Sequence, residues 1–325
     1  MAFTYTPFKH TGKHASEIFS EVVEEAATTA QNLITFYDNV KDEINLTTFS
    51  GEPEFDAYQE KIREADLDNY ATELEASDYT MVPKKMQSII LFEMDKLRGT
   101  RFGESMKAGA NNIQSTTFES AARTHLTPRY ALAFEKKIWC SITPATKTLI
   151  ANSNTATVSQ KAWAAAQTTS AKNVVDGLIA KAILAGIKPL SATTITSTNL
   201  KDQYEKLFVE LPSAVLGKKE CLVYAPHSHK LMIDIFNTNQ TYRDIFKVSG
   251  DVYTFHGKRI AFVSLPENSL VSGLGPEFGA ATDLLSDSVS FEIGKVNNVG
   301  DQMFSKLTCS LDTGIVVPSQ KVLYI

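Results

Sequence analysis

The change of secondary structure that decides the fold class lies in residues 200–224, whose sequence is LKDQYEKLFVELPSAVLGKKECLVY. The first half places apolar residues at positions 200, 204, 207, 208 and 211, which share one face of a helix. Pro212 ends this helix because proline cannot continue its hydrogen bonds. The apolar run Cys221–Tyr224 is short and continuous, as in a buried strand. Helical character therefore gives way to strand character here.

Helical patterns dominate the chain before this point. The spacing of apolar residues predicts helices over residues 16–30, 83–97, 117–139, 173–186 and 200–211. Pro128 falls inside the third of these, where it predicts a kink or a restart. A short helix is expected around residues 231–236.

Strand patterns dominate after it. Residues 252–255 and 259–263 flank a His-Gly-Lys turn and predict a hairpin. Residues 289–296, 303–311 and 315–317 are further strand candidates, and the apolar end at 322–325 predicts a last strand held in a sheet. The predicted class is α+β, with helices in the first two-thirds and strands in the last third.

Several segments lack the pattern of a packed element. Residues 1–14 predict an arm that is extended or disordered in isolation, and residues 32–50 predict extended chain. Residues 51–77 are acidic and weakly periodic, which is unusual inside a compact domain and predicts a projection that packs on something outside the subunit. Residues 141–170 and 266–282 predict exposed loops.

Composition excludes several classes of function. Apolar residues make up 43% of the 325 residues and charged residues 21%, as in a folded globular protein. The net charge of −5, from 32 basic and 37 acidic residues, gives no basis for tight binding to a phosphate backbone. The sequence shows no secretion signal and no run of about eighteen apolar residues, so we expect folding in a cytoplasm and no membrane span.

Candidate chemistry is sparse. His227-Ser228-His229 begins a predicted helix, where residues two apart diverge, so a metal site is not expected. The glycines of residues 272–279 lack the spacing of a dinucleotide or phosphate loop, because Pro276 and Phe278 interrupt it. Cys140, Cys221 and Cys309 are far apart and indicate free thiols, as in a reducing compartment. We therefore expect no catalytic residue, no cofactor and no metal.

The arm, the charged projection and a core without a site need one explanation. Ordering backbone costs about 1–2 kcal/mol per residue, so an isolated subunit gains little by fixing such segments. Neighbouring copies related by symmetry could bury them. The sequence thus favours a protein that assembles with copies of itself.

The order of these parts resembles the HK97-fold major capsid proteins of tailed bacteriophages over nearly the whole chain. The match is carried by the arm, the acidic projection, the helix TTFES…FEKKIW at 116–139, the run NVVDGL at 173–178 and the closing strands to DTGIVVP at 312–318. It implies an α+β capsid fold with an N-terminal arm and helix (1–50), an extended loop or E-loop (51–82), a peripheral domain with a spine helix (83–190), an axial domain (191–290) and return strands (291–325). The 266–282 loop would then lie near the capsomer axis.

The resemblance also implies a function and partners. These are pentamers and hexamers in an icosahedral shell, dsDNA inside it without sequence-specific binding, portal and scaffolding proteins, and a location in the virion capsid after assembly in the host cytoplasm. The expected contacts between subunits are Phe8, Tyr58, Tyr70, Tyr79, Glu277 and Phe278. The alternatives are an encapsulin-like compartment, a tail-tube or head-completion protein, and, in a different class, a cytoplasmic hydrolase with an unrecognised site.

Overall fold

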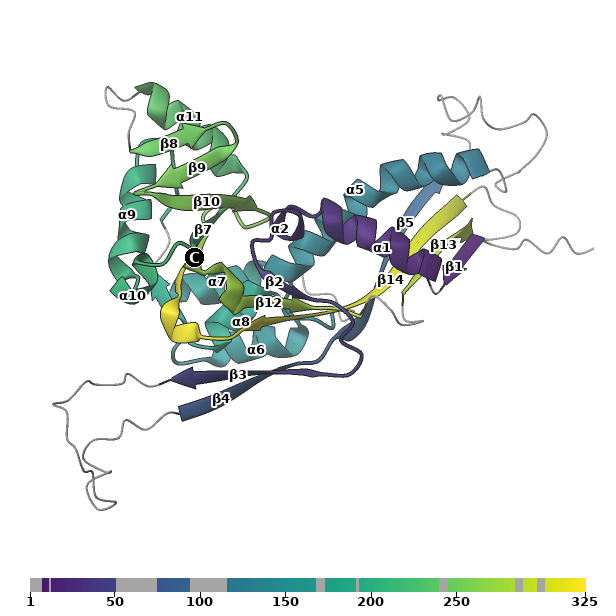
Figure 1. Ribbon diagram of the computed structural model, residues 1–325, viewed down its shortest axis with the longest axis horizontal. Coiled ribbons are helices and arrows are strands. Elements are labelled where there is room, and N and C mark those ends of the chain that lie inside the picture. The colour runs from purple at the N-terminus through teal and green to yellow at the C-terminus, as the bar shows by residue number, and fades with distance from the viewer. Residues whose placement is uncertain are drawn as a thin grey trace, which may run out of the picture.

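Two lobes and a ribbon make up the described part of the chain (Figure 1). One lobe is built on a seven-stranded sheet and the longer one on a six-stranded sheet, while the two-stranded ribbon pairs with neither. The computed structural model describes residues 8–11, 13–50, 75–93, 116–167, 173–190, 193–239, 245–283, 289–296 and 302–325, and the fold is given for these residues.

The seven-stranded sheet forms the lobe at the upper left of Figure 1. Its strand order is β6-β15-β11-β7-β10-β9-β8, with parallel pairing only at β6–β15 and β7–β10. The expected hairpin is confirmed, and His256 (φ 48°) and Gly257 (φ 78°) form its turn in the left-handed region. The strands are β6 (Lys188–Leu190), β7 (Cys221–Pro226), β8 (Phe246–Ser249), β9 (Val252–Phe255), β10 (Lys258–Val263), β11 (Leu270–Leu274) and β15 (Val322–Tyr324).

Helices α9 (Leu200–Glu210), α10 (Ser213–Leu216) and α11 (Ser228–Asn239) belong to this lobe. The helix predicted from residues 200–211 is therefore confirmed, and its apolar face carries Tyr204, which is fully buried. The rings of Phe246 and Phe255 pack against Tyr204 with centroids 5.4 and 5.5 Å away. This aromatic group fills the core between helices and sheet.

The six-stranded sheet forms the longer lobe. Its order is β1-β13-β14-β12-β2, and β5 pairs with the free side of β14 from Lys84 opposite Leu311 to Glu93 opposite Gln302. β14 is thus the central strand and the longest one. The strands are β1 (Phe8–Thr11), β2 (Thr35–Tyr37), β5 (Lys84–Glu93), β12 (Phe278–Ala281), β13 (Ser290–Lys295) and β14 (Gln302–Ile315).

A long helix, α5 (Thr116–Cys140), lies along this sheet beside α1 (Lys13–Glu25), and α2 (Ala27–Ala30) follows α1 (Figure 1). Phe19 of α1 meets Phe134 of α5 edge to face at 5.4 Å. Tyr130 of α5 donates its hydroxyl hydrogen to β14, with Ser305 oxygens at 2.8 and 2.9 Å. The helices expected near 16–30 and 116–139 are present, and α5 continues through Pro128 without a restart.

Trp139, at the end of α5, joins the two lobes. Its ring packs against Tyr224 of β7 at 4.8 Å and against Phe278 of β12 at 6.3 Å. Its indole N–H donates to the hydroxyl of Thr28 at 2.8 Å, so the one polar group of this buried ring is satisfied. The junction between the sheets is therefore a packed core.

Three sequence-based predictions of secondary structure are wrong. Residues 84–93 form strand β5 and not part of a helix, because they pair in register with β14 over ten positions, with half-buried and exposed side chains alternating from Met86 on. Residues 141–170 contain α6 (Pro144–Asn152) and α7 (Val158–Ala166) and not only a loop, since Thr143 and Thr157 cap these helices. The expected concentration of strands in the last third does not hold either, since strands occur in the first third, two of them within residues 32–50, which were expected to be extended.

Two further segments correct the expected layout. Residues 266–282 are not an exposed loop: β11 is buried between β7 and β15, and β12 is buried beside β14. Residues 8–11 of the expected arm pair with β13 as an edge strand. The apolar end does lie in a sheet as β15, but in the seven-stranded one and not with the return strands β13 and β14.

Candidate functional site

The two-stranded ribbon is the feature that sets this molecule apart from an ordinary two-lobed protein. Strands β3 (Ile44–Ser50) and β4 (Glu75–Met81) pair antiparallel and extend along the lower side of the molecule in Figure 1. Thr47 donates to the carboxylate of Asp78 at 2.6 Å across the strands. Most described side chains of the ribbon are exposed or half-buried, so it is a projection and not a core element.

Within the described part of the ribbon, the end that carries Ile44, Leu46, Tyr79 and Met81, here called its root, packs against the rest of the chain. Met81 is fully buried and, with Val40 and Ala281, forms a small separate core that Tyr79 helps to cover. Gly314 of β14 permits this approach, because a Cβ there would lie 2.6 Å from both the Met81 sulfur and the Tyr79 ring. The root is therefore held by a few close apolar contacts.

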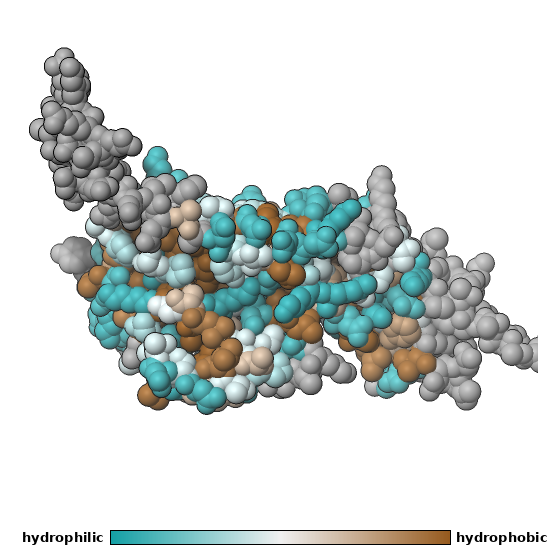
Figure 2. Space-filling model, turned by 90° about the horizontal axis from the view of Figure 1, so that it is seen from below, coloured by the Kyte–Doolittle hydropathy of each residue, from teal (hydrophilic) through white to brown (hydrophobic). Residues whose placement is uncertain are grey.

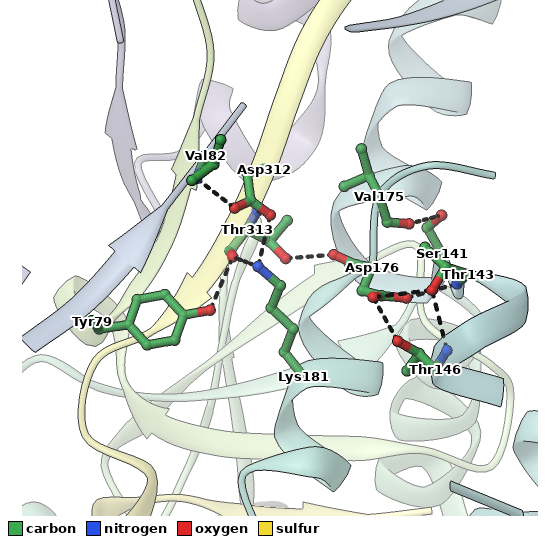
Figure 3. A network of polar contacts seen from close by, with 10 residues as sticks. All are labelled: Tyr79, Val82, Ser141, Thr143, Thr146, Val175, Asp176, Lys181, Asp312 and Thr313. Carbon is green, nitrogen blue, oxygen red and sulfur yellow. Dashed lines mark hydrogen bonds and ion pairs between the residues drawn. The ribbon is translucent and has the colours of Figure 1, made fainter. Parts of the chain in front are cut away.

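A polar network adds to them (Figure 3). Asp312 of β14 accepts the backbone N–H of Val82 at 2.9 Å and the ammonium of Lys181 at 2.6 Å. Lys181 also donates to the carbonyl of Thr313, and its Nζ lies 5.7 Å from the centre of the Tyr79 ring. The Tyr79 hydroxyl donates to the same carbonyl at 3.3 Å. The root of the ribbon is thus clamped to β14 and to helix α8 (Leu178–Leu184), which carries Lys181.

The network continues from β14 to α6. Thr313 donates its hydroxyl hydrogen to the backbone carbonyl of Asp176 at 2.7 Å. The Asp176 carboxylate accepts the backbone N–H of Thr143 at 2.6 Å and the hydroxyl of Thr146 at 2.7 Å (Figure 3). Carboxylate acceptors at a helix start stabilise its unpaired N–H groups. The polar contacts at the root are therefore connected through β14 to the start of helix α6.

Strand β5 offers a surface that the described residues leave uncovered. Its one partner among the described strands is β14. Ile89 and Leu91 project from it with 51% and 57% of their surface exposed. Seen from the side of the ribbon, the surface alternates hydrophobic and hydrophilic patches (Figure 2). Such a surface is suited to contact with another chain.

Two clefts border helix α5. One of about 650 Å³ lies between the end of α5 and the start of α11, and contains Cys140 and Ser228. The other, of about 810 Å³, lies between β5 and α5. Burial raises the pKa of the Cys140 thiol to about 12, so this thiol is protonated and a poor nucleophile. Neither cleft offers the paired base and nucleophile of acyl transfer among its described residues.

No three His, Cys, Asp or Glu side chains among the described residues could hold a metal ion together. Cys221 and Cys309 are buried, as expected for free thiols. In the part of the chain that the structure describes, no helix is long and apolar enough to cross a membrane.

His229 is a core residue and not a metal ligand. Its Nε2–H donates to the carbonyl of Glu267 at 3.0 Å, and its Nδ1 accepts the hydroxyl of Tyr204 at 3.1 Å. Burial lowers the pKa of His229 from 6.5 to about 4, and the hydrogen bond to Glu267 opposes this shift in part. The neutral ring therefore bridges α9, α11 and the loop after β10.

Of the six residues expected to contact other subunits, the structure describes the side chains of Tyr79, Glu277 and Phe278. Phe278 is completely buried within this chain, which corrects its assignment to a subunit contact. Glu277 pairs with the buried ammonium of Lys321 at 2.6 Å, an internal contact. Tyr79 lies at the root of the ribbon. Phe8 belongs to β1, but its side chain lies outside the described residues, as do Tyr58 and Tyr70.

The sequence reasoning missed Asp312 and Lys181. Each is the lone charge in an apolar stretch, one in the strand over residues 307–316 and the other in the helix LIAKAIL at 178–184. Charged residues in buried elements are rarely left without a partner. Two lone charges of opposite sign could therefore have indicated a pair.

No protein-family model matches the sequence, and no curated protein is similar to it. The structure is similar to a chain of the satellite phage P4 procapsid including size determination (Sid) protein, with a TM-score of 0.52, 11% identity, and coverage of 95% of this chain and 97% of that one. A chain of Microbacterium phage Oxtober96 matches with a TM-score of 0.51 and 8% identity, covering 100% and 94% of the two chains. The capsid of the native GTA particle matches with a TM-score of 0.50 and 8% identity, covering 92% and 89%.

These likenesses extend over nearly the full length of both chains, and they show the fold. The α+β class expected from the sequence is confirmed. The chain has a fold of phage capsid subunits, of the HK97 type. The division into arm, E-loop, peripheral domain and axial domain stays a prediction.

Proposed function

We propose that the chain is a major capsid protein, a structural subunit and not an enzyme, that assembles with copies of itself into pentamers and hexamers of an icosahedral shell around phage dsDNA. The observation that carries the proposal is the projecting ribbon on a capsid-type fold. Ordering a projection gains little for an isolated subunit, while a neighbouring copy can bury it.

The two lobes are suited to separate roles in such a shell. We assign the six-stranded sheet with α5 to the peripheral domain and the seven-stranded sheet to the axial domain. The ribbon would be the base of the E-loop. These two domains do not correspond to two continuous ranges of residue numbers. Strand β12 belongs to the six-stranded sheet, although the strand that comes last in the chain, β15, belongs to the seven-stranded sheet.

The partners follow from the same role. The net charge of −5 suits a shell that encloses DNA without gripping it. Portal and scaffolding proteins would assist assembly in the host cytoplasm, and the mature protein would reside in the virion capsid. The exposed apolar side chains of β5, Ile89 and Leu91, form the surface that we expect neighbouring copies to use.

Negative-stain electron microscopy tests the proposal on the purified chain, alone and co-expressed with the genes that neighbour its own. Closed shells with pentameric and hexameric units are expected, and nuclease-protected DNA in co-expressed particles would support a phage capsid. Shells that hold protein in place of DNA would contradict the phage assignment. A monomer or small oligomer under both conditions would overturn the proposal.

A further inference from the structure

Two connections join the ribbon to the longer lobe: residues 38–43 between β2 and β3, and the two residues Val82 and Pro83 between β4 and β5. Strand β4 ends at Met81 and β5 begins at Lys84, so a swing of the ribbon relative to the six-stranded sheet needs a rotation at Val82 or Pro83 together with a change in residues 38–43. Pro83 has a fixed φ and restricts the residue before it. The backbone N–H of Val82 is held by the carboxylate of Asp312 at 2.9 Å. A charged acceptor thus fixes the joint at Val82 from outside the ribbon.

Asp312 is itself held firmly. Its Oδ1 accepts the ammonium of Lys181 at 2.6 Å and the backbone N–H of Thr313 at 2.8 Å. The side chains of Asp312 and Lys181 are only 15% and 19% exposed, so water competes weakly for them. Both are also paired, which limits the cost of burying their charges.

Lys181 transmits this position to the body through α8. The residue before that helix, Gly177, donates its N–H to Ser141 at 2.7 Å, and a Cβ on it would lie 2.7 Å from the carbonyl oxygen of Trp139. The start of α8 is therefore fixed against the end of α5, where the two lobes join. A continuous set of contacts runs from the ribbon joint through β14 and α8 to the core.

The apolar core at the root is small by comparison. Among the described residues its buried members are Val40, Met81 and Ala281, and the residues packed against them are only partly buried, namely Tyr37, Ile44, Leu46 and Tyr79. Loss of the charges should therefore free the ribbon without unfolding the lobes. We propose that Asp312 and Lys181 are positioning residues that set the angle of the β3–β4 ribbon and thereby the geometry of the shell. This inference rests on the proposed function.

The angle of the ribbon affects the whole shell because symmetry repeats it in every copy. In a head-to-tail contact every copy repeats the same rotation, and the assembly closes only if that rotation is correct. A ribbon free to swing would offer neighbours a range of angles. Closed shells of one size would then give way to open or irregular assemblies.

The test uses the double variant Lys181→Met/Asp312→Leu. Replacing a buried ion pair by apolar residues of similar volume is often neutral for stability, while Val82 loses its charged acceptor. The matched control is Lys188→Met, which removes the ion pair between Lys188 and Glu210 on the other lobe. Urea unfolding, particle images and particle-size distributions are measured for both and for the unaltered chain.

We expect the double variant to unfold at the urea concentration of the unaltered chain, yet to yield uniform closed shells at least about tenfold less often, because each contact repeats the error. The control should assemble normally. If the double variant forms the same shells as the unaltered chain, the inference is overturned while the proposed function stands. If the unaltered chain forms no shells, the proposed function fails instead.

A second measurement reads the angle without any shell. Spin labels are placed at Ala76→Cys on the ribbon and Ala151→Cys on α6, both exposed positions, and labelled chains are diluted with unlabelled ones. The unaltered background should give one narrow distance distribution, and Lys181→Met/Asp312→Leu a broad one. Equally narrow distributions centred at the same distance would contradict a positioning role for the pair.

Discussion

The lobe of the seven-stranded sheet and the root of the ribbon are held in different ways. In the lobe, Tyr204, Phe246 and Phe255 lie in a core where each ring has several aromatic neighbours. At the root of the ribbon, Met81 lies in a small apolar core, and the ion pair between Asp312 and Lys181 supplies the polar contacts beside it. Apolar packing among many neighbours stabilises a lobe, while a few directional contacts fix the orientation of a projection.

The largest loss of stability is expected in the aromatic core of the seven-stranded lobe. Phe255→Ala removes a fully buried ring and should lower the free energy of unfolding by about 4 kcal/mol, through lost burial and the cavity left behind. Urea unfolding of the unassembled subunit measures it. Val209→Ala, at a side chain 81% exposed on the neighbouring helix α9, is the control and should change stability by less than about 0.5 kcal/mol. Equal effects of the two changes would deny that this core stabilises the lobe.

A pH-dependent loss is expected in the same lobe. The pKa of His229 is lowered from 6.5 to about 4, so the unfolded chain takes up a proton before the folded one does. This contribution is fully present above pH 6.5 and is lost as the pH falls towards 4, to a total of roughly 3 kcal/mol. Unfolding curves measured across that range should show the slope, and His229→Gln should reduce it. An unchanged slope in the variant would place the titrating group elsewhere.

A smaller effect is expected at the root. Gly314→Ala places a methyl group against Met81 and Tyr79 and should cost about 2 kcal/mol of local stability by overpacking. Faster proteolysis at the ribbon, with the lobes left intact, is the readout. Gly217→Ala is the control, because a Cβ there meets its nearest atom at an ordinary 3.7 Å. Unfolding of the whole subunit by Gly314→Ala would show that the root is not separable from the lobes.

The smallest effect is expected at a surface ion pair. Lys201 and Glu205 lie one turn apart on α9 at 3.4 Å, and both are about two-fifths exposed. Lys201→Ala should change stability by roughly 0.3 kcal/mol, an effect that salt screens. A change in stability comparable with that of Gly314→Ala would mean that an exposed ion pair contributes as much as the apolar packing at the root.

The sequence predicted elements whose local pattern and tertiary environment agree. The helix at 200–211, the hairpin around Gly257 and the last strand all have strong signals, and all are present. The prediction failed at 84–93, where Met86, Ile89 and Ile90 fit a helix as well as a strand, and pairing with β14 decided for the strand. It failed at 266–282 because glycines there serve close packing and not exposure.

The candidate site was less predictable. The acidic segment 51–77 indicated a projection, and most of it lies outside the described residues; the strands on either side of it, β3 and β4, form a ribbon outside both main sheets. The clamp at its root joins residues 181 and 312, which are far apart in the sequence. In the sequence, the one sign that these two residues could pair is that each is the only charged residue in an apolar stretch. Whether two such residues meet in space depends on the fold. Contacts between subunits depend in addition on neighbours, so single aromatic residues such as Phe278 were poor guides.

The mass of the particles that the purified chain forms in solution tests the central claim most directly. Light scattering coupled to size separation, with negative-stain images of the same fractions, gives that mass. We predict a discrete species whose mass is a large multiple of the 35.8 kDa subunit and whose images show closed shells. A species that stays at the mass of one or a few subunits, at every concentration and with co-expressed partners, would contradict the claim.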